Sequence, residues 1–276
     1  MQPSLKRIQF LLALVICCVF GVARAQDMGP PGDAGVTPDL EGRPEPIWRF
    51  SAGAGPGVAA DYEGSDDYKF VPVFAARAQR QEIFVALTGT TAIANLLPDP
   101  VFRLGPLLRV RTSRDDVESA AVDSLQDIDT AVELGAFAGF EAGGWEGEVE
   151  IAQDVADAHG GFLVGLQLAH TLDVLPAVPI TVKAFTTWAS HDYMQTYFGI
   201  DAAGSMRSGL DTFGAESGFK NVGLNVGARY PLASNWILAG TVSYARLLGD
   251  AADSPVTADA GSANQWFGTL IVTYVF

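Results

Sequence analysis

The residues of this sequence that could do chemistry are its histidines and its clustered acids. The stretch "SHD" at Ser190, His191 and Asp192 contains the three residue types of a nucleophilic relay. Neighbours on an extended chain point to opposite sides, so these three cannot form a relay with one another. His159 lies in the short turn "DAHGG" and His170 shares a face with apolar residues, so we interpret both as surface histidines. We therefore expect no catalytic residue and no enzymatic activity.

Acidic residues gather in two stretches that could collect a cation. They are Asp61, Glu63, Asp66, Asp67, Asp115, Asp116, Asp123, Asp127 and Asp129. Calcium binds carboxylate oxygens, but calcium loops hold them at a fixed spacing that these residues lack. We interpret the acids as solvated loop charges and expect neither a metal nor a cofactor.

Charged residues also alternate with apolar ones in three consecutive segments, residues 101–112, 131–142 and 145–156. Side chains alternate at period two along a strand, so the charges share one face. The set is Arg103, Arg109, Arg111, Glu133, Glu141, Glu146, Glu148 and Glu150. Adjacent strands bring such side chains within about 5 Å, which predicts a ladder of opposite charges. The ladder would either stiffen a narrow interior or line a selective pore.

The same alternation recurs in eleven segments, with one apolar face and one small or polar face. They are residues 47–60, 68–79, 82–97, 101–112, 131–142, 145–156, 161–175, 178–190, 218–231, 235–248 and 264–276. A soluble sandwich also alternates, but aromatic residues near the segment ends and lengths of about 10 to 14 residues favour strands that span a membrane. The sequence thus predicts an all-β protein, an antiparallel transmembrane β-barrel of the outer-membrane type.

The strand count depends on residues 82–97. Bacterial barrels have an even number of strands. A turn near Gly89 would split this segment and give twelve strands; ten is the alternative. The connections 113–130, 191–217 and 249–263 are long and fall on one side, which we take as the outer face because periplasmic turns are short.

The start of the chain has the layout of a secretory signal. Lys6 and Arg7 precede an apolar run, and the small residues Ala23 and Ala25 mark the cleavage site. We expect a cleaved signal peptide at 1–25, a disordered periplasmic leader at 26–46 and an outer-membrane barrel at 47–276. The signal holds three of the 17 basic residues and none of the 32 acidic ones, which leaves a net charge of −18. That charge argues against nucleic acid as a partner.

The last strand ends on "TLIVTYVF". Its apolar face is formed by Leu270, Val272, Tyr274 and Phe276. This pattern resembles the signal read by the barrel-insertion machinery. We expect the face to contact outer-membrane lipid and the strand to pair with the first one, because barrel closure leaves no unpaired backbone in lipid.

Five stretches resemble the MltA-interacting protein family, also called MipA/OmpV. They are "DYEGSDDY" at 61–68, "LGPLLRVR" at 104–111, "DYMQTYFG" at 192–199, "GFKNVGLNVGARY" at 218–230 and "SYARLLGDAADSPV" at 243–256. The family loop positions are Asp61, Tyr62, Glu63, Gly64, Asp192, Tyr193, Gln195, Tyr197, Phe198, Gly249, Asp250, Asp253, Ser254 and Pro255. Asn221 follows Lys220 where the family often has an acid, which weakens a charge pair there.

The resemblance implies a non-enzymatic outer-membrane scaffold that joins a lytic murein transglycosylase to a bifunctional murein synthase. Other members are described as porin-like, so a channel for small solutes is the alternative. The topology places the loop motifs on the outer face, away from murein. We therefore expect Tyr62, Tyr68, Tyr193 and Tyr197 to fold inward as a loop plug.

Overall fold

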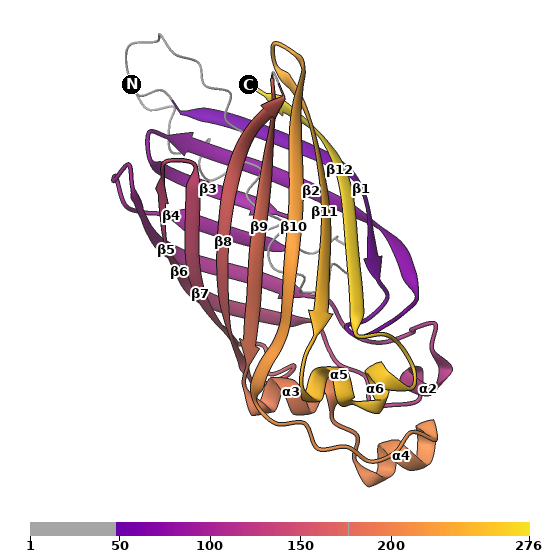
Figure 1. The fold of residues 1–276 in the computed structure, drawn as a ribbon. Helices are drawn as coiled ribbons and strands as arrows, with labels where there is room; N and C mark the ends of the chain where they lie inside the picture. Colours follow the sequence, from indigo (N-terminus) through magenta and orange to yellow (C-terminus); the bar gives the residue numbers. More distant parts are fainter. Residues whose placement is uncertain (1–47, 176) are drawn as a thin grey trace, which may run out of the picture.

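The chain folds into one closed barrel of twelve antiparallel strands, in which β1 pairs with β12 (Figure 1). This is a computed structural model, which describes residues 48–175 and 177–276. The expected signal peptide with Ala23 and Ala25, and the expected leader, lie outside the described residues. The prediction of a twelve-stranded outer-membrane-type barrel is confirmed.

Ten of the eleven predicted segments correspond to one strand each, and the remaining one, residues 82–97, contains two. The strands are β1 (Arg49–Ala60), β2 (Tyr68–Arg80), β3 (Ile83–Thr88), β4 (Thr91–Asn95), β5 (Phe102–Arg111), β6 (Ala131–Ala142), β7 (Trp145–Asp154), β8 (Phe162–Leu175), β9 (Val178–Ala189), β10 (Gly218–Ala233), β11 (Trp236–Leu247) and β12 (Asn264–Val275). The β3–β4 turn lies at Gly89, whose φ of 56° favours glycine.

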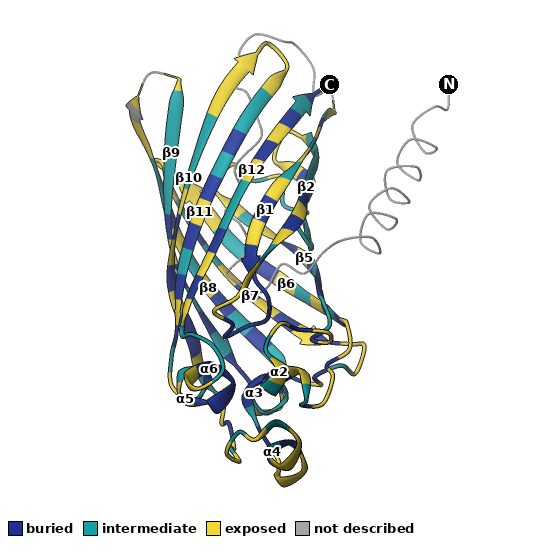
Figure 2. Cartoon of the chain, turned by 90° about the vertical axis from the view of Figure 1, so that its right-hand side faces the viewer, coloured by how far each residue is buried: buried dark blue, intermediate teal, exposed yellow. Residues whose placement is uncertain are grey.

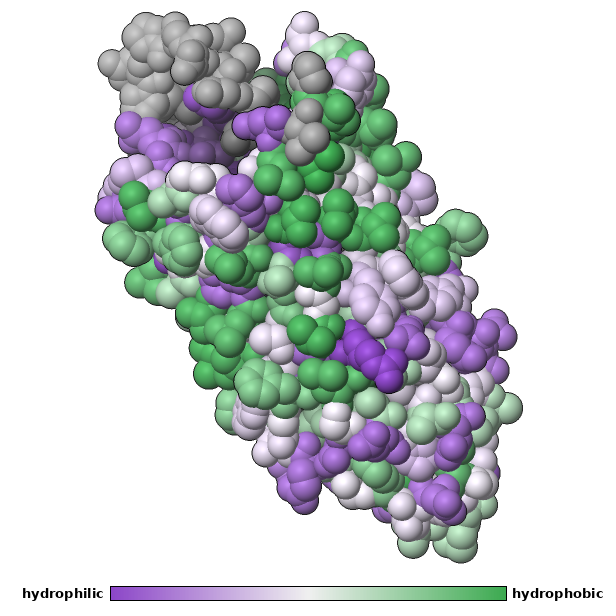
Figure 3. Space-filling model, viewed as in Figure 1, coloured by the Kyte–Doolittle hydropathy of each residue, from purple (hydrophilic) through white to green (hydrophobic). Residues whose placement is uncertain are grey.

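Burial alternates along the strands as the sequence pattern requires. Figure 2 shows the alternating bands of buried and exposed residues on β11 and β12. The exposed positions carry large apolar side chains such as Leu224, Val242 and Leu270. Figure 3 shows apolar residues gathered over the strands, while the loop-bearing lower part is mostly hydrophilic or pale. An apolar outer band of this kind is the surface that a barrel presents to lipid.

Aromatic pairs lie at both ends of the apolar band. Trp236 faces Tyr274 across β11 and β12 with ring centroids 4.9 Å apart, and Tyr244 faces Trp266 at 4.8 Å. Such girdles mark the two interfaces of a membrane. The last residue closes the seam, because the Phe276 backbone N–H donates to Phe50 O at 2.9 Å.

The β3–β4 hairpin is short and leaves part of β2 with one strand neighbour. Pairing of β2 with β3 begins at Ala75 and Thr88. Within the described residues, 68–73 of β2 have no strand partner on that side. Pro72 lies in this stretch, where its missing N–H costs no ladder hydrogen bond.

The long connections gather at the end of the barrel opposite the C-terminus (Figure 1). They carry the short helices α2 (Ala120–Asp123), α3 (His191–Phe198), α4 (Ala202–Ser208), α5 (Asp250–Asp253) and α6 (Pro255–Ala258). In the described part of the chain, no helix is long and apolar enough to cross a membrane. We call the connections 61–67, 112–130, 190–217 and 248–263 together the outer cap.

Candidate functional site

The charged residues of β5 and β7 meet inside the barrel. Arg103 Nη2 lies 2.6 Å from Glu146 Oε1, and Arg109 Nη2 lies 2.7 Å from Glu150 Oε1. Since every even step along β5 returns the side chain to the same face, these arginines point inward while Leu104 and Leu108 point outward. The structure therefore places opposite charges side by side across the lumen.

Glu133 on β6 is the centre of the ladder. Its side chain is fully buried and accepts from Arg111 Nε at 2.9 Å, and Arg109 Nη1 lies 3.6 Å away. Buried charges are stable only when they are paired, so this carboxylate holds both arginines in place. Glu141 differs from the rest, because it lies at the short-turn end with its side chain 65% exposed, 3.8 Å from Arg103.

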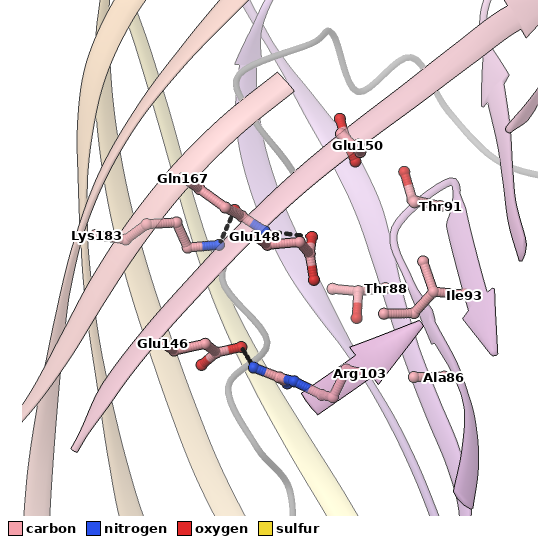
Figure 4. Close-up of a pocket in the computed structure, with 10 residues that line it drawn as sticks. All are labelled: Ala86, Thr88, Thr91, Ile93, Arg103, Glu146, Glu148, Glu150, Gln167 and Lys183. Atoms are coloured by element: carbon pink, nitrogen blue, oxygen red, sulfur yellow. Dashed lines mark hydrogen bonds and ion pairs between the residues drawn. The ribbon is translucent and has the colours of Figure 1, made fainter. Parts of the chain in front are cut away.

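The ladder continues onto β8 and β9. Lys183 Nζ donates to Gln167 Oε1 at 2.9 Å, and Gln167 Nε2 donates to Glu148 at 2.5 Å (Figure 4). These side chains, with Thr88 and Ile93 on the facing wall, line a cavity of about 40 Å³. That volume holds roughly three water molecules. The charged and polar side chains of the ladder thus project into the lumen at this level.

A second buried charge centre lies under the outer cap. Lys220 is fully buried on β10, and its ammonium contacts the carboxylate of Glu63 from the β1–β2 connection. Tyr193 on α3 donates its hydroxyl to Glu63 Oε2 at 2.6 Å. Lys220 therefore has an acid partner from a connection far away in sequence, in place of an acid at the next position, where Asn221 stands. Glu63 and Asp61 are buried and paired with lysines, not solvated as expected.

A β-bulge explains why Lys220 faces inward. The pairing of β9 and β10 shifts between Phe219 and Asn221. The extra residue leaves Phe219 and Val222 exposed while Lys220 and Asn221 are both buried. Bulges re-aim side chains in this way. The signal in the sequence is the broken alternation, two polar residues between two apolar ones.

His159 is buried, which corrects the prediction of a surface histidine. Its Nε2 lies 3.2 Å from Glu133, and its Nδ1 accepts from the Gly161 backbone N–H at 3.1 Å. Its ring meets Tyr193 edge-on at 5.0 Å. His159 therefore connects the lumen ladder to the outer cap. His170 stacks on Trp145 at the short-turn end of the barrel, and His191 starts α3 beside Glu216.

The other loop-motif residues make architectural contacts in the cap. Tyr62 donates to Ala260 O at 2.5 Å, Gln195 accepts from Ala215 N at 3.0 Å, and Ser254 donates to Phe198 O at 2.6 Å. Tyr197 is buried and stacks on Tyr193. Tyr68 is 41% exposed at the start of β2 and lies outside the cap core, contrary to expectation.

The remaining motif positions differ in backbone conformation, contacts and exposure. Gly64 and Gly249 have positive φ, of 99° and 50°. Asp250 accepts from the Glu216 backbone N–H at 2.7 Å, and Pro255 begins α6. Asp192 and Asp253 are exposed.

Burial shifts the pKa values of three side chains in the outer cap. It raises the pKa of the Tyr197 phenol and of the Tyr62 phenol, and it lowers the pKa of Arg114 to about 10. Within residues 48–175 and 177–276, no group of three or more metal-binding side chains comes together. The arrangement offers buried ion pairs and a packed outer end.

The chain matches the family model described as MltA-interacting protein MipA over residues 52–276. It is 28% identical over 178 residues to outer membrane protein Omp26La of Vibrio anguillarum and 28% identical over 182 residues to outer membrane protein OmpV of Vibrio cholerae. Each match covers 64% of this chain and 66% of the relative, slightly less than two thirds of its length. Among solved structures, the translocator domain of autotransporter NalP from Neisseria meningitidis has a TM-score of 0.44 at 10% identity, covering 86% of this chain and 91% of that one.

Proposed function

Since this chain belongs to the MltA-interacting protein MipA family and is an outer-membrane β-barrel, we propose that it is a closed, non-enzymatic anchor for murein enzymes. The observation that carries the proposal is the ladder of ion pairs inside the barrel between β5, β6 and β7. These side chains narrow the path through the barrel, and the cavity beside Glu148 and Lys183 is about 40 Å³. We infer that the barrel acts through its surface. The family description, which names an interaction with MltA, supports a lytic murein transglycosylase as one partner.

The partner surface in this proposal is the short-turn end, which faces the periplasm by the short-turn rule. It contains the connections 96–101, 143–144 and 234–235. Exposed apolar groups lie at the strand ends beside them, among them Leu232 of β10, which is 50% exposed. We propose that this end and the leader 26–46, freed after cleavage of residues 1–25, hold the transglycosylase and a bifunctional murein synthase together.

Affinity capture tests the anchor. The mature protein, tagged in the leader, is solubilised from envelopes with detergent, beside an unrelated barrel as control. We expect specific recovery of a lytic transglycosylase or a murein synthase. Leu232→Asp should reduce the recovery, and Met206→Asp should not, because Met206 is 82% exposed on α4 at the opposite end. Recovery of only the insertion machinery and general envelope proteins would contradict the proposal.

A porin-like channel is the second candidate, and the polar lining of the lumen cavity favours it. Glu148, Gln167 and Lys183 offer a hydrophilic path where a plug alone would need only apolar packing. Conductance of the purified barrel in a planar bilayer distinguishes the two candidates. Glu148→Gln shifts ion selectivity if the lumen conducts, whereas the anchor predicts no stable conductance for either protein.

A further inference from the structure

The outer cap contains a buried cation that forms no ion pair in the part of the chain that the structure describes. Arg114 is only 8% exposed, and no ion pair within residues 48–175 and 177–276 includes it. Its Nη1 donates to Tyr197 O at 2.8 Å, and its Nη2 makes a long contact to Gln126 O at 3.4 Å. Its Nε has no hydrogen-bond partner. A buried guanidinium with an unused donor is costly, because its charge has lost water and gained little in return.

Arg114 lines a cavity of about 290 Å³ between the connection 112–130 and the helices α3 and α4. A second cation, Arg207 of α4, lies on the same wall and donates to Ser124 O at 3.0 Å. Gln195 and Thr196 add polar groups to the lining. The cavity has room for a small ligand, and its two arginines come from separate parts of the cap.

Two acids share the lining and limit what the cavity can hold. Asp201 accepts from the Gly204 backbone N–H at 2.6 Å, so its carboxylate caps α4. Asp127 is exposed at the edge. Two positive and two negative groups suit a ligand with one anionic group better than one with several, since further negative charge would meet these carboxylates.

We propose that this cavity binds a small soluble oxyanion, a carboxylate or a phosphate group, from the outer medium between the guanidinium groups of Arg114 and Arg207. A guanidinium presents paired N–H donors, which match the two oxygens of a carboxylate or phosphate. Arg207 supplies a second attraction. Burial lowers the pKa of Arg114 while the nearby Asp127 raises it. A bound oxyanion would add the direct ion pair that Asp127 does not form. This site is independent of the murein anchor at the opposite end.

Calorimetric titration of the purified mature barrel in detergent tests the proposal, with inorganic phosphate and acetate as separate probes. We expect saturable binding of at least one probe and a rise in the melting temperature when it is present. Binding of phosphate alone or acetate alone supports the site and identifies the preferred group. Absence of saturable binding for both probes overturns it.

Variants assign the binding to the cavity. Arg114→Gln should weaken the affinity by about tenfold or more, because charge-assisted hydrogen bonds are lost. Arg207→Gln should weaken it by a smaller factor, and this exposed substitution leaves the cap packed even if Arg114→Gln does not fold. Arg246→Gln removes an exposed arginine of β11 that does not line the cavity and is the matched control. Equal affinity in the Arg207 and Arg246 variants would place binding elsewhere and overturn the proposal.

Discussion

Removing one partner of the Glu63 and Lys220 pair should destabilise the barrel strongly. Lys220 has no exposed side-chain surface and Glu63 has 6%, so the remaining charge could not be hydrated without opening the cap. Breaking a buried pair from one side typically costs about 3–5 kcal/mol. We expect a loss of this size in the free energy of unfolding for Glu63→Gln and for Lys220→Met.

The double variant Glu63→Gln with Lys220→Met tests whether the two side chains interact directly. With both charges gone, no uncompensated ion remains, and the loss should be smaller than the sum of the two single losses by about 2 kcal/mol or more. Tyr193 would keep a partner, because the glutamine carbonyl at position 63 still accepts from its hydroxyl. The non-additivity is the signature of a direct interaction.

Urea unfolding of the folded barrel in detergent micelles measures these losses, followed by the electrophoretic shift between folded and unfolded forms. Limited proteolysis of the cap measures local opening in parallel. Glu216→Gln, which removes a 78% exposed carboxylate from the same cap, is the control and should change neither readout. Single losses below 1 kcal/mol, or a double loss equal to the sum, would refute the reasoning.

Three further outcomes are expected. Deletion of Phe276 should lower the level of protein in the outer-membrane fraction, and a normal level would contradict a role of the last strand in insertion. Glu133→Gln should reduce the free energy of unfolding by about 3 kcal/mol because two arginines lose their carboxylate, whereas Glu141→Gln should have little effect in the same urea titration. The pKa of Asp99 is lowered by hydrogen bonds from the backbone N–H of Phe102 and of Val101. A lowered folded-state pKa stabilises the protein above the ordinary value of 3.8, so the difference in stability between wild type and Asp99→Ala should be full at neutral pH and disappear as the pH falls well below 3.8.

The strands could be predicted from the sequence because lipid imposes a strict period-two pattern. Leu224 and Val242 face outward in the structure as alternation required. The turn at Gly89 could be placed because glycine tolerates its positive φ. Lys183 could have been found in the same way, since it alternates with Val182 and Ala184.

The cap could not be predicted in the same detail. Its burial depends on contacts between connections that are distant in sequence, and loops have no periodicity to reveal which side is covered. His159 appeared to be a surface residue because its turn is short, yet α3 from a separate connection covers it. The burial of Lys220 could not be predicted from alternation, because a bulge interrupts the pattern at that residue.

The contacts of the outer cap join segments that are far apart in the sequence, and this sets the order in which parts of the barrel fold. Glu63 and Lys220 are 157 residues apart, and Tyr193 and Glu63 are 130 apart. Contacts between such distant segments form late in folding, since the intervening chain must be ordered first. Each of these bonds joins the first connection of the barrel to its last third. The cap can therefore form only after most of the barrel has folded. In a pulse-chase experiment, the time at which the cap loops become resistant to protease should mark when the two ends of the sheet have paired.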